Sequence, residues 1–329
     1  MFRALLAAAL FSLAPLTAHA QTPPPTQGEQ EASPPRLRQR DYSEIAITSR
    51  DGLEYRILVS VPRGRAPDGG FPVFYILDGD GFFNTAVEIA RMREWGRLTP
   101  SIIVGVAYPS RSFYDGPRRT HDFTPPTFSD ATFDPAEVGG ADQFLAFLTG
   151  ELKPWVAEHY AIDPNRQVLF GHSLGGMFVL HALYTAPHSF NVFLAASPSL
   201  RLSDRYIIRE GAVFDTQPAA ERHAVRALVT VGTLESGRNE EQIDDYRRWF
   251  TAHPEATGGA NVETALREMF PADHFDKVGE TRRIARRLSR NGADATFLAF
   301  EGDEHLPAGV SALLHGIPFA LRPSRRGRQ

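Results

Sequence analysis

Residues 171–175 have the pattern G-x-S-x-G, with Ser173 at the centre. A strand-like apolar run precedes the pattern and a helix-like run follows it, which is the strand–turn–helix context of a nucleophile elbow. Glycines suit this turn because larger side chains there would collide with the strand or the helix. We therefore predict that Ser173 is a catalytic nucleophile. The non-catalytic alternative is a Gly-rich helix start that Ser173 caps.

A nucleophilic serine needs a base, and His305 is the best candidate. It follows the last apolar run, residues 296–300, in a predicted loop, which is where the base of such an enzyme belongs. His172 is a weaker candidate because the second residue of an elbow points away from the position of the base. His274, in a Pro- and Asp-rich insertion, is another weak candidate. A solvated loop histidine is the non-catalytic interpretation of His305.

Glu235 is the predicted acid of a Ser-His-Glu triad. It lies just after the penultimate apolar run, residues 227–231, and there it would orient the imidazole and stabilise the imidazolium. A helix-cap carboxylate or a surface charge is the alternative role. Asp303 or Glu304 could instead contact the histidine locally, and a Ser–His dyad could work without an acid.

The oxyanion charge that develops when a serine attacks a carbonyl needs two preorganised N–H donors. The N–H of Leu174, directly after the nucleophile, is the first predicted donor. The second should come from the turn after the third strand, where we predict the N–H of Asp80, with Gly79 as the alternative. The spacing of Asp78 and Asp80 does not match a calcium-binding loop. We expect neither a metal nor a cofactor.

Apolar runs and helix-like segments alternate along the chain, and this alternation predicts a wound α/β sheet. Residues 42–49 and 53–61 flank an Asp-Gly turn and predict an antiparallel N-terminal hairpin. The later runs are short and almost continuously apolar, as in parallel strands buried on both faces: 73–77, 102–107, 168–170, 192–196, 227–231 and 296–300. The predicted helices are 82–98, 141–160, 174–185, 240–252 and 276–290. The prediction is an eight-stranded, mostly parallel sheet with helices on both faces.

Residues 108–140 are rich in Pro, Gly and Asp and predict a long loop beside the site. Arg119 and Tyr114 in this segment, together with His172, are our predicted substrate-binding residues. Arginine and aromatic side chains would suit a large anionic, aromatic ligand. A surface arginine that pins the loop to Asp122 is the alternative role for Arg119.

The N-terminus has the features of a secretory signal peptide. Residues 1–20 contain a charged start, an apolar stretch too short to span a bilayer, and the cleavage signature Ala18-His19-Ala20. Residues 21–40 are a Pro-rich linker, residues 41–320 are predicted to form a single domain, and residues 321–329 are a basic tail. We expect a periplasmic or secreted protein without stable membrane insertion after cleavage.

Composition narrows the chemistry further. The 329 residues include no cysteine, which excludes disulfides, a thiolate nucleophile and Cys-ligated metals. A net charge of −4 gives no basic excess, so nucleic acid is not an expected partner. Lys153 and Lys277 are the only lysines, and we interpret this as a compositional bias rather than as a site.

With these motifs, the sequence resembles the putative-esterase family of α/β-hydrolases, most closely its siderophore-esterase branch, which is related to esterase D. The likeness rests on residues 75–80, 119–125, 171–176 and 196–200, on Glu235 after Val231-Gly232, and on Gly302 with Glu304-His305. The resemblance implies an α/β-hydrolase fold with Ser173, Glu235 and His305 as the triad. It also supports Asp80 and Leu174 as oxyanion donors.

The sequence therefore predicts an exported serine hydrolase that acts on a carboxylic ester of a small molecule through an acyl-enzyme. A siderophore ester is one candidate substrate. The alternatives are an acyltransferase, a feruloyl or acetyl esterase acting on carbohydrate, and a non-catalytic binding protein with the same fold.

Overall fold

The structure is a computed structural model that describes residues 42–95, 98–130, 133–236, 240–257, 261–269 and 275–322. All of these residues belong to the unit Asp41–Gln329. The predicted signal peptide, the linker and His274 lie outside the described residues, as does all of the basic tail after residue 322.

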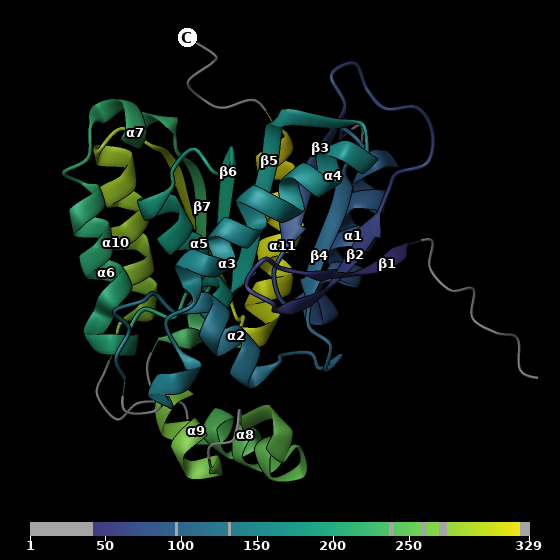
Figure 1. Ribbon diagram of the computed structural model, residues 1–329. Coiled ribbons are helices and arrows are strands. Elements are labelled where there is room, and N and C mark those ends of the chain that lie inside the picture. The colour runs from purple at the N-terminus through teal and green to yellow at the C-terminus, as the bar shows by residue number, and fades with distance from the viewer. Residues whose placement is uncertain are drawn as a thin grey trace, which may run out of the picture. The chain divides into compact units, whose positions relative to one another are not determined.

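Eight strands form one sheet in the order β1-β2-β4-β3-β5-β6-β7-β8 (Figure 1). The strands are β1 (Ser43–Thr48), β2 (Glu54–Ser60), β3 (Phe71–Ile76), β4 (Ile102–Ala107), β5 (Ile162–His172), β6 (Val192–Ala196), β7 (Arg226–Gly232) and β8 (Asp294–Phe300). β2 is antiparallel to both β1 and β4, whereas all neighbours from β4 to β8 are parallel. The predicted fold class is confirmed, including the antiparallel hairpin.

The central strands are buried on both faces. Every residue of β3, β4 and β6 is buried, and the last six residues of β5 are buried as well. A strand with polar residues on alternate positions could not occupy such a place, because the polar groups would lose water without gaining partners. This explains why the sequence signal was a continuous apolar run.

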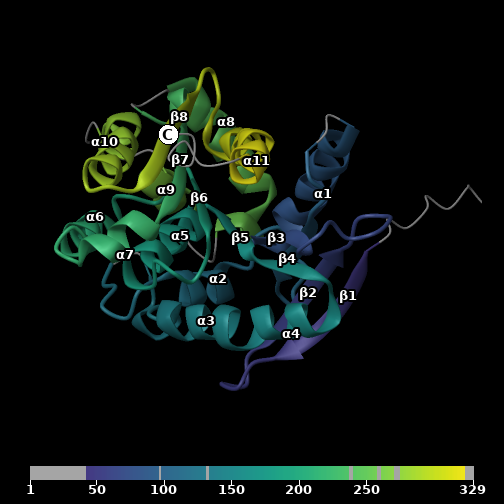
Figure 2. The same ribbon diagram turned by 90° about the horizontal axis from the view of Figure 1, so that it is seen from above.

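Helices cover the sheet on both sides, and short 3₁₀ and π turns connect some of them. The α-helices are α1 (Gly79–Trp95), α2 (Gly116–Phe123), α3 (Ala141–Phe147), α4 (Lys153–His159), α5 (Leu174–Thr185), α6 (Leu202–Phe214), α7 (Ala219–Ala224), α8 (Glu240–Ala252), α9 (Val262–Met269), α10 (Lys277–Arg290) and α11 (His305–Leu321). Figure 2 shows α1 and α11 on one side of the sheet, and α3, α4, α5, α6 and α10 on the other.

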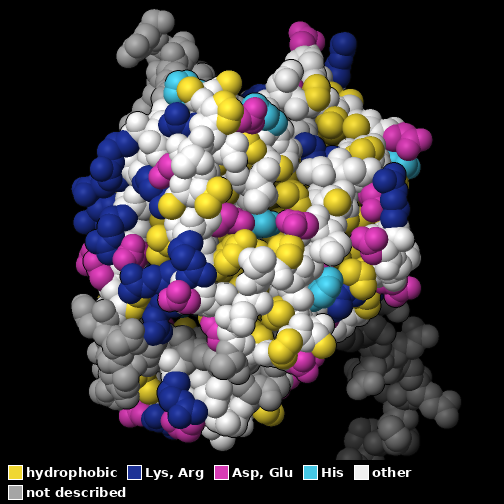
Figure 3. Space-filling model, turned by 60° about the vertical axis from the view of Figure 1, so that its left-hand side comes forward, with side chains coloured by type: hydrophobic (Ala, Val, Ile, Leu, Met, Phe, Trp, Pro, Cys, Tyr) yellow, Lys and Arg dark blue, Asp and Glu magenta, His cyan; other side chains and the backbone are white. Residues whose placement is uncertain are grey.

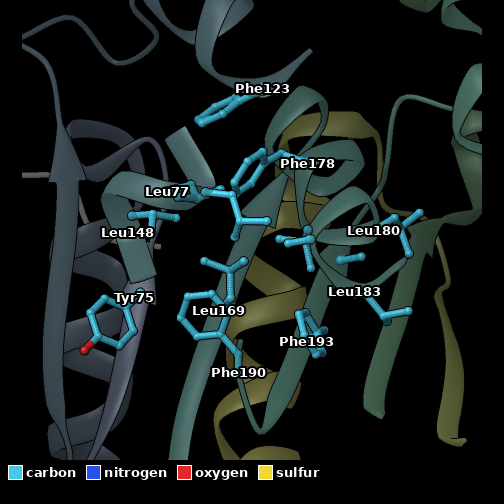
Figure 4. Close-up of a cluster of buried hydrophobic side chains, with 14 of the residues drawn as sticks. Tyr75, Leu77, Phe123, Leu148, Leu169, Phe178, Leu180, Leu183, Phe190 and Phe193 are labelled. Carbon is cyan, nitrogen blue, oxygen red and sulfur yellow. The ribbon is translucent and has the colours of Figure 1, made fainter. Parts of the chain in front are cut away.

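Alternate residues of β5 point into two hydrophobic cores, one on each face of the sheet. Leu169 packs on the side of α5, where Phe178 and Phe193 meet it (Figure 4). Val168 and Phe170 point to the opposite core, which α1 and α11 complete. Each fully buried Phe or Leu contributes about 1.5–3 kcal/mol relative to an exposed side chain. The strand that carries the nucleophile is therefore fixed from both faces.

One loop prediction and one helix prediction were wrong, and α6, α7, α9 and α11 were not among the predicted helices. The predicted loop 108–140 contains α2, which Asp115 caps by accepting a hydrogen bond from the N–H of Arg118. The predicted single helix 141–160 is divided into α3 and α4 by a π turn, Leu148–Leu152. Pro154 explains the division, since proline has no N–H to donate to the preceding turn.

The surface carries charges of both signs. On the face shown in Figure 3, basic side chains gather mainly on the left-hand half, and acidic and apolar side chains are interspersed with them. Among the helices that the structure describes, none combines the length and the apolar character needed to cross a membrane.

Candidate active site

Ser173 lies in a sharp turn between β5 and α5. Its φ of 61° and ψ of −118° are strained for a residue with a side chain, as a nucleophile elbow requires. A Cβ at Gly171 would collide with the carbonyl oxygen of Gly175, and one at Gly176 would lie 2.6 Å from the carbonyl oxygen of Ala196. These contacts show why the motif needs its glycines: the strand, the turn and α5 approach too closely for larger side chains.

The structure brings Ser173, His305 and Glu235 together, although 132 and 70 residues of sequence separate His305 from the two others. The Oγ of Ser173 lies 2.9 Å from Nε2 of His305, and Nδ1 of His305 lies 2.6 Å from Oε2 of Glu235. Since a carboxylate only accepts, Nδ1 carries the proton and Nε2 accepts from the serine hydroxyl. A serine so placed can lose its proton to the imidazole as it attacks.

His305 is the first residue of α11 rather than part of a loop, which corrects the sequence prediction. The turn that precedes it, residues 301–304, follows β8, so the expected end of the sheet is retained. Burial lowers the pKa of His305, the ammonium of Lys277 lowers it further, and the Glu235 carboxylate acts in the opposite direction. The net effect favours the neutral imidazole, which is the form that can accept a proton.

Glu235 lies in a 3₁₀ turn, Thr233–Glu235, directly after β7. Its Oε1 accepts from the N–H of Gly232 at 2.8 Å and from the hydroxyl of Ser197 at 2.6 Å. Its Oε2 accepts from His305 and from the ammonium of Lys277, both at 2.6 Å. Burial opposes the charge of Glu235, but Lys277 and His305 outweigh it and hold the pKa of this carboxyl well below its usual range.

Sequence reasoning missed two of these partners. Ser197 has a φ of 44° in the turn after β6, and its conformation aims the hydroxyl at Glu235. Lys277 begins α10, 42 residues after Glu235. The scarcity of lysine was a usable signal, because one of only two lysines in the chain contacts the acid. Compositional bias alone therefore does not account for Lys277.

The two predicted oxyanion donors lie at the starts of helices that follow neighbouring strands. The N–H of Leu174 precedes the first intrahelical bond of α5, from the N–H of Met177 to the carbonyl of Ser173. The N–H of Asp80 likewise precedes the first bonds of α1, which the carbonyl of Asp78 accepts. A Cβ at Gly175 would lie 3.4 Å from the Asp78 carboxylate, so the two helix starts are close together. The N–H groups in the first turn of a helix have no partner within the helix, and such groups suit a developing oxyanion.

His172, which we predicted to bind substrate, lies inside the protein between Tyr114 and His305. Its side chain is fully buried. Nε2 donates to the carbonyl oxygen of His305 at 2.7 Å, and Nδ1 accepts from the hydroxyl of Tyr114 at 2.9 Å. Burial and the neighbouring His305 hold the pKa of His172 well below its ordinary value. A neutral His172 therefore links Tyr114 to the backbone of the base.

Arg119 also differs from its predicted role. It is buried, and its guanidinium donates to both oxygens of Asp78 at 3.0 and 3.1 Å. The guanidinium stacks over the ring of Tyr114, 4.3 Å from its centroid. Its charge is thus compensated inside the protein, and the partner is Asp78 rather than Asp122. Tyr114 remains partly exposed, and Phe113 beside it is 52% exposed.

The residues described hold no cluster of three or more His, Asp and Glu side chains arranged for a metal. The arrangement of Ser173 and His305 has the geometry that acyl transfer by a serine with a histidine base requires.

Comparisons with known proteins identify the family. The sequence profile of the putative esterase family matches residues 49–313. The ferri-bacillibactin esterase BesA of Bacillus subtilis is 29% identical over 293 residues, which span 85% of this chain and 90% of the relative. The siderophore enterobactin esterase of Emericella nidulans is 38% identical over 191 residues, 53% of this chain and 63% of the relative.

Solved structures agree with this assignment. The BES protein from Bacillus cereus has a TM-score of 0.68 and 27% identity, and the match covers 88% of this chain and 97% of the other. The siderophore hydrolase EstA from Aspergillus nidulans has a TM-score of 0.67 and 27% identity over 85% of this chain and 94% of the other. The chain therefore belongs to the putative esterase family, on an α/β-hydrolase fold.

Proposed function

We propose that the protein is an exported serine esterase that cleaves an ester bond of a siderophore. The observation that carries the proposal is one continuous hydrogen-bonded path, from the hydroxyl of Ser173 through the imidazole of His305 to the carboxylate of Glu235. The relatives named as esterases of ferri-bacillibactin and enterobactin support this substrate class.

In the proposed mechanism, the Ser173 oxygen attacks the ester carbonyl while its proton passes to Nε2 of His305. The N–H groups of Leu174 and Asp80 donate to the oxyanion of the tetrahedral intermediate. The ester C–O bond breaks, and the leaving alkoxide takes the proton from His305. Water then attacks the acyl-enzyme with His305 again as the base, which releases the acid and restores Ser173. Glu235 stays ionised throughout and stabilises the imidazolium.

A substrate panel tests the proposal. Ferri-bacillibactin, ferric enterobactin, short p-nitrophenyl esters and feruloyl sugars should be compared by kcat/KM, with Ser173→Ala as the matched inactive variant. We expect hydrolysis of a siderophore with the highest kcat/KM, and loss of both hydrolysis and fluorophosphonate labelling in Ser173→Ala. A higher kcat/KM for a feruloyl sugar would show that the substrate is a carbohydrate ester rather than a siderophore. Full activity of the purified Ser173→Ala protein would refute the serine mechanism.

Export is the second part of the proposal, and it rests on the signal-like residues 1–20. Expression of the full chain in a bacterial host, followed by cell fractionation and N-terminal sequencing, tests it. We expect periplasmic or secreted protein that begins at Gln21. Uncleaved protein in the cytoplasmic fraction would contradict export while leaving the esterase proposal intact.

A further inference from the structure

Lys277 occupies an unusual place beside the triad. Its ammonium lies 2.6 Å from Oε2 of Glu235 and 3.3 Å from Nδ1 of His305. The Lys277 side chain is only 15% exposed and that of Glu235 only 3%. A half-buried or buried ion pair costs desolvation, so such a pair needs good geometry to persist. The geometry here is good, because donors bind both oxygens of the Glu235 carboxylate and Lys277 is one of the two donors to Oε2.

The helix that carries Lys277 does not need this cation. Lys277 is the first residue of α10, and a positive charge at a helix N-terminus is unfavourable because the helix dipole is positive there. Asp276 already caps the helix by accepting from the N–H of Gly279 at 2.7 Å. The local sequence would therefore favour an acidic or neutral residue at position 277, and the contact with Glu235 is what explains lysine.

The contact between Lys277 and His305 is electrostatically unfavourable once the imidazole is protonated. Nδ1 of His305 carries a proton that it donates to Oε2 of Glu235, and an ammonium can only donate. The 3.3 Å approach therefore joins two donors that share one acceptor oxygen. When Nε2 takes up a proton, the imidazolium charge forms next to the ammonium. Lys277 consequently disfavours the protonated imidazole while it holds the carboxylate in place.

We propose that Lys277 is a positioning residue of the triad, which fixes Glu235 against Nδ1 of His305 and keeps the resting imidazole neutral in mildly acidic surroundings. This inference rests on the proposed function, because it concerns the same Ser-His-Glu site. It predicts an enzyme that remains active at a pH where an ordinary Ser-His-Glu triad has lost its base to protonation.

The other groups near His305 do not replace Lys277. The charge of Arg119 also disfavours the imidazolium, but Asp78 compensates that guanidinium directly. His172 is neutral for the reasons given above. Burial raises the pKa of the Tyr114 phenol and raises that of Tyr246 to about 12, so both phenols are uncharged. Lys277, Glu235 and Arg119 act electrostatically on His305 itself. His172 and the phenols Tyr114 and Tyr246 lie around this cluster, and Asp78 and Glu304 act on these phenols.

The pH profile of kcat/KM for a short p-nitrophenyl ester tests the inference on the full-length protein. Lys277→Met removes the charge and keeps a long apolar side chain. Its acid limb should move to higher pH by about one unit, which lowers kcat/KM about tenfold below the limb and much less above it. Lys277→Arg should restore most of the wild-type profile. Lys153→Met is the matched control, since Lys153 is the chain's other lysine and its ammonium binds the carbonyl of Ser189.

The outcomes separate cleanly. A uniform loss of activity in Lys277→Met, without a shift of the limb, would assign Lys277 to folding alone and overturn the inference. An unshifted and undiminished profile would overturn it as well. NMR titration of His305 in the wild type keeps the test independent of variant folding: a pKa at or above the ordinary value of about 6.5 would contradict the inference. A wild type that hydrolyses no ester and resists fluorophosphonate would instead defeat the proposed function.

Discussion

Nε2 of His172 donates a hydrogen bond to the backbone carbonyl oxygen of His305 at 2.7 Å. His172, directly before Ser173 in the sequence, thus holds the main chain of His305. The centroids of the two imidazole rings lie 4.5 Å apart. The bond requires a proton on Nε2 of His172, so Nδ1 must accept from the hydroxyl of Tyr114. Tyr114 therefore fixes the tautomer of a side chain that positions His305.

Tyr114→Phe should lower both the free energy of unfolding and kcat. The variant leaves Nδ1 of His172 buried without a donor, which costs about 1–3 kcal/mol. It also frees His172 to change tautomer and release the backbone of His305. Urea unfolding and steady-state kinetics measure the two effects. The matched control is Tyr108→Phe, because the buried hydroxyl of Tyr108 has no hydrogen-bond partner in the part of the chain that the structure describes. Equal behaviour of the two variants would contradict this role of Tyr114.

Glu235→Gln should reduce kcat by about 10²- to 10⁴-fold with little change in KM. An amide can present its nitrogen to Nδ1 of His305 and so favour the wrong tautomer, and it cannot stabilise the imidazolium by charge. Asp303→Asn and Glu304→Gln remove the neighbouring carboxylates that could act in place of Glu235, and we expect them to stay within a few-fold of wild type. If one of these two variants lost activity while Glu235→Gln kept it, the acid would be reassigned.

Gly171→Ala should damage the elbow. The new methyl group would collide with the carbonyl oxygen of Gly175, so the turn must shift, at a cost of about 1–3 kcal/mol in stability. The displaced Ser173 should also react more slowly with a fluorophosphonate. Gly150→Ala is the control, because a Cβ at Gly150 meets no atom within 4 Å. Labelling rates and urea unfolding would have to be the same for both variants to refute the steric argument.

His181 should stabilise the protein in a pH-dependent way. It is buried, with Nδ1 bonded to Glu210 of α6 and Nε2 to Asp142 of α3, all at 3.0 Å. Burial alone would lower the pKa of His181, but the two carboxylates outweigh it and raise the pKa. A raised pKa means that the contribution is complete below the unfolded value of about 6.5 and is lost as the pH rises through the folded value.

The measurement is the free energy of unfolding of the wild type and of His181→Gln between about pH 5.5 and pH 9. The difference between them should be largest at the acidic end and should shrink as the pH rises. His188→Gln serves as the control, since His188 pairs with Glu221 at the surface and exposed pairs contribute little. A His181 difference that grows with pH would show that the sign is wrong.

The sequence predicted those elements whose signal is local. The strands at 102–107 and 192–196 and the helix at 174–185 match the structure residue for residue, because uniform burial made their apolar runs continuous. α2 was missed since only part of it is buried, and Pro117 and Asp115 were interpreted as loop residues although Pro and Asp also begin helices. A weighting of capping residues alongside hydrophobicity would have found this helix.

At the site, sequence motifs predicted which three side chains lie together, but not the contacts from other elements that hold them in place. The elbow pattern and the strand order predicted that Ser173, His305 and Glu235 would lie together, as they do in the structure. The contacts of Lys277 and Arg119 depend on side chains that reach across distant elements, which no local pattern encodes. Arg119 pairs with Asp78, 41 residues away, rather than with the nearby Asp122, which accepts from the hydroxyl of Tyr55 at 3.0 Å.

Lys277 and Val278 also connect the two ends of the chain segment that contains α8 and α9. The ammonium of Lys277 holds Glu235, and the N–H of Val278 donates to the hydroxyl of Ser236 at 2.8 Å, so both ends of the segment that contains α8 and α9 are pinned at the triad. Doubling the length of a flexible loop costs only about 0.6 kcal/mol. A change of length between these two contacts therefore costs little free energy by itself. The two contacts hold the acid and the start of α10 together at the point where the segment leaves and rejoins the domain.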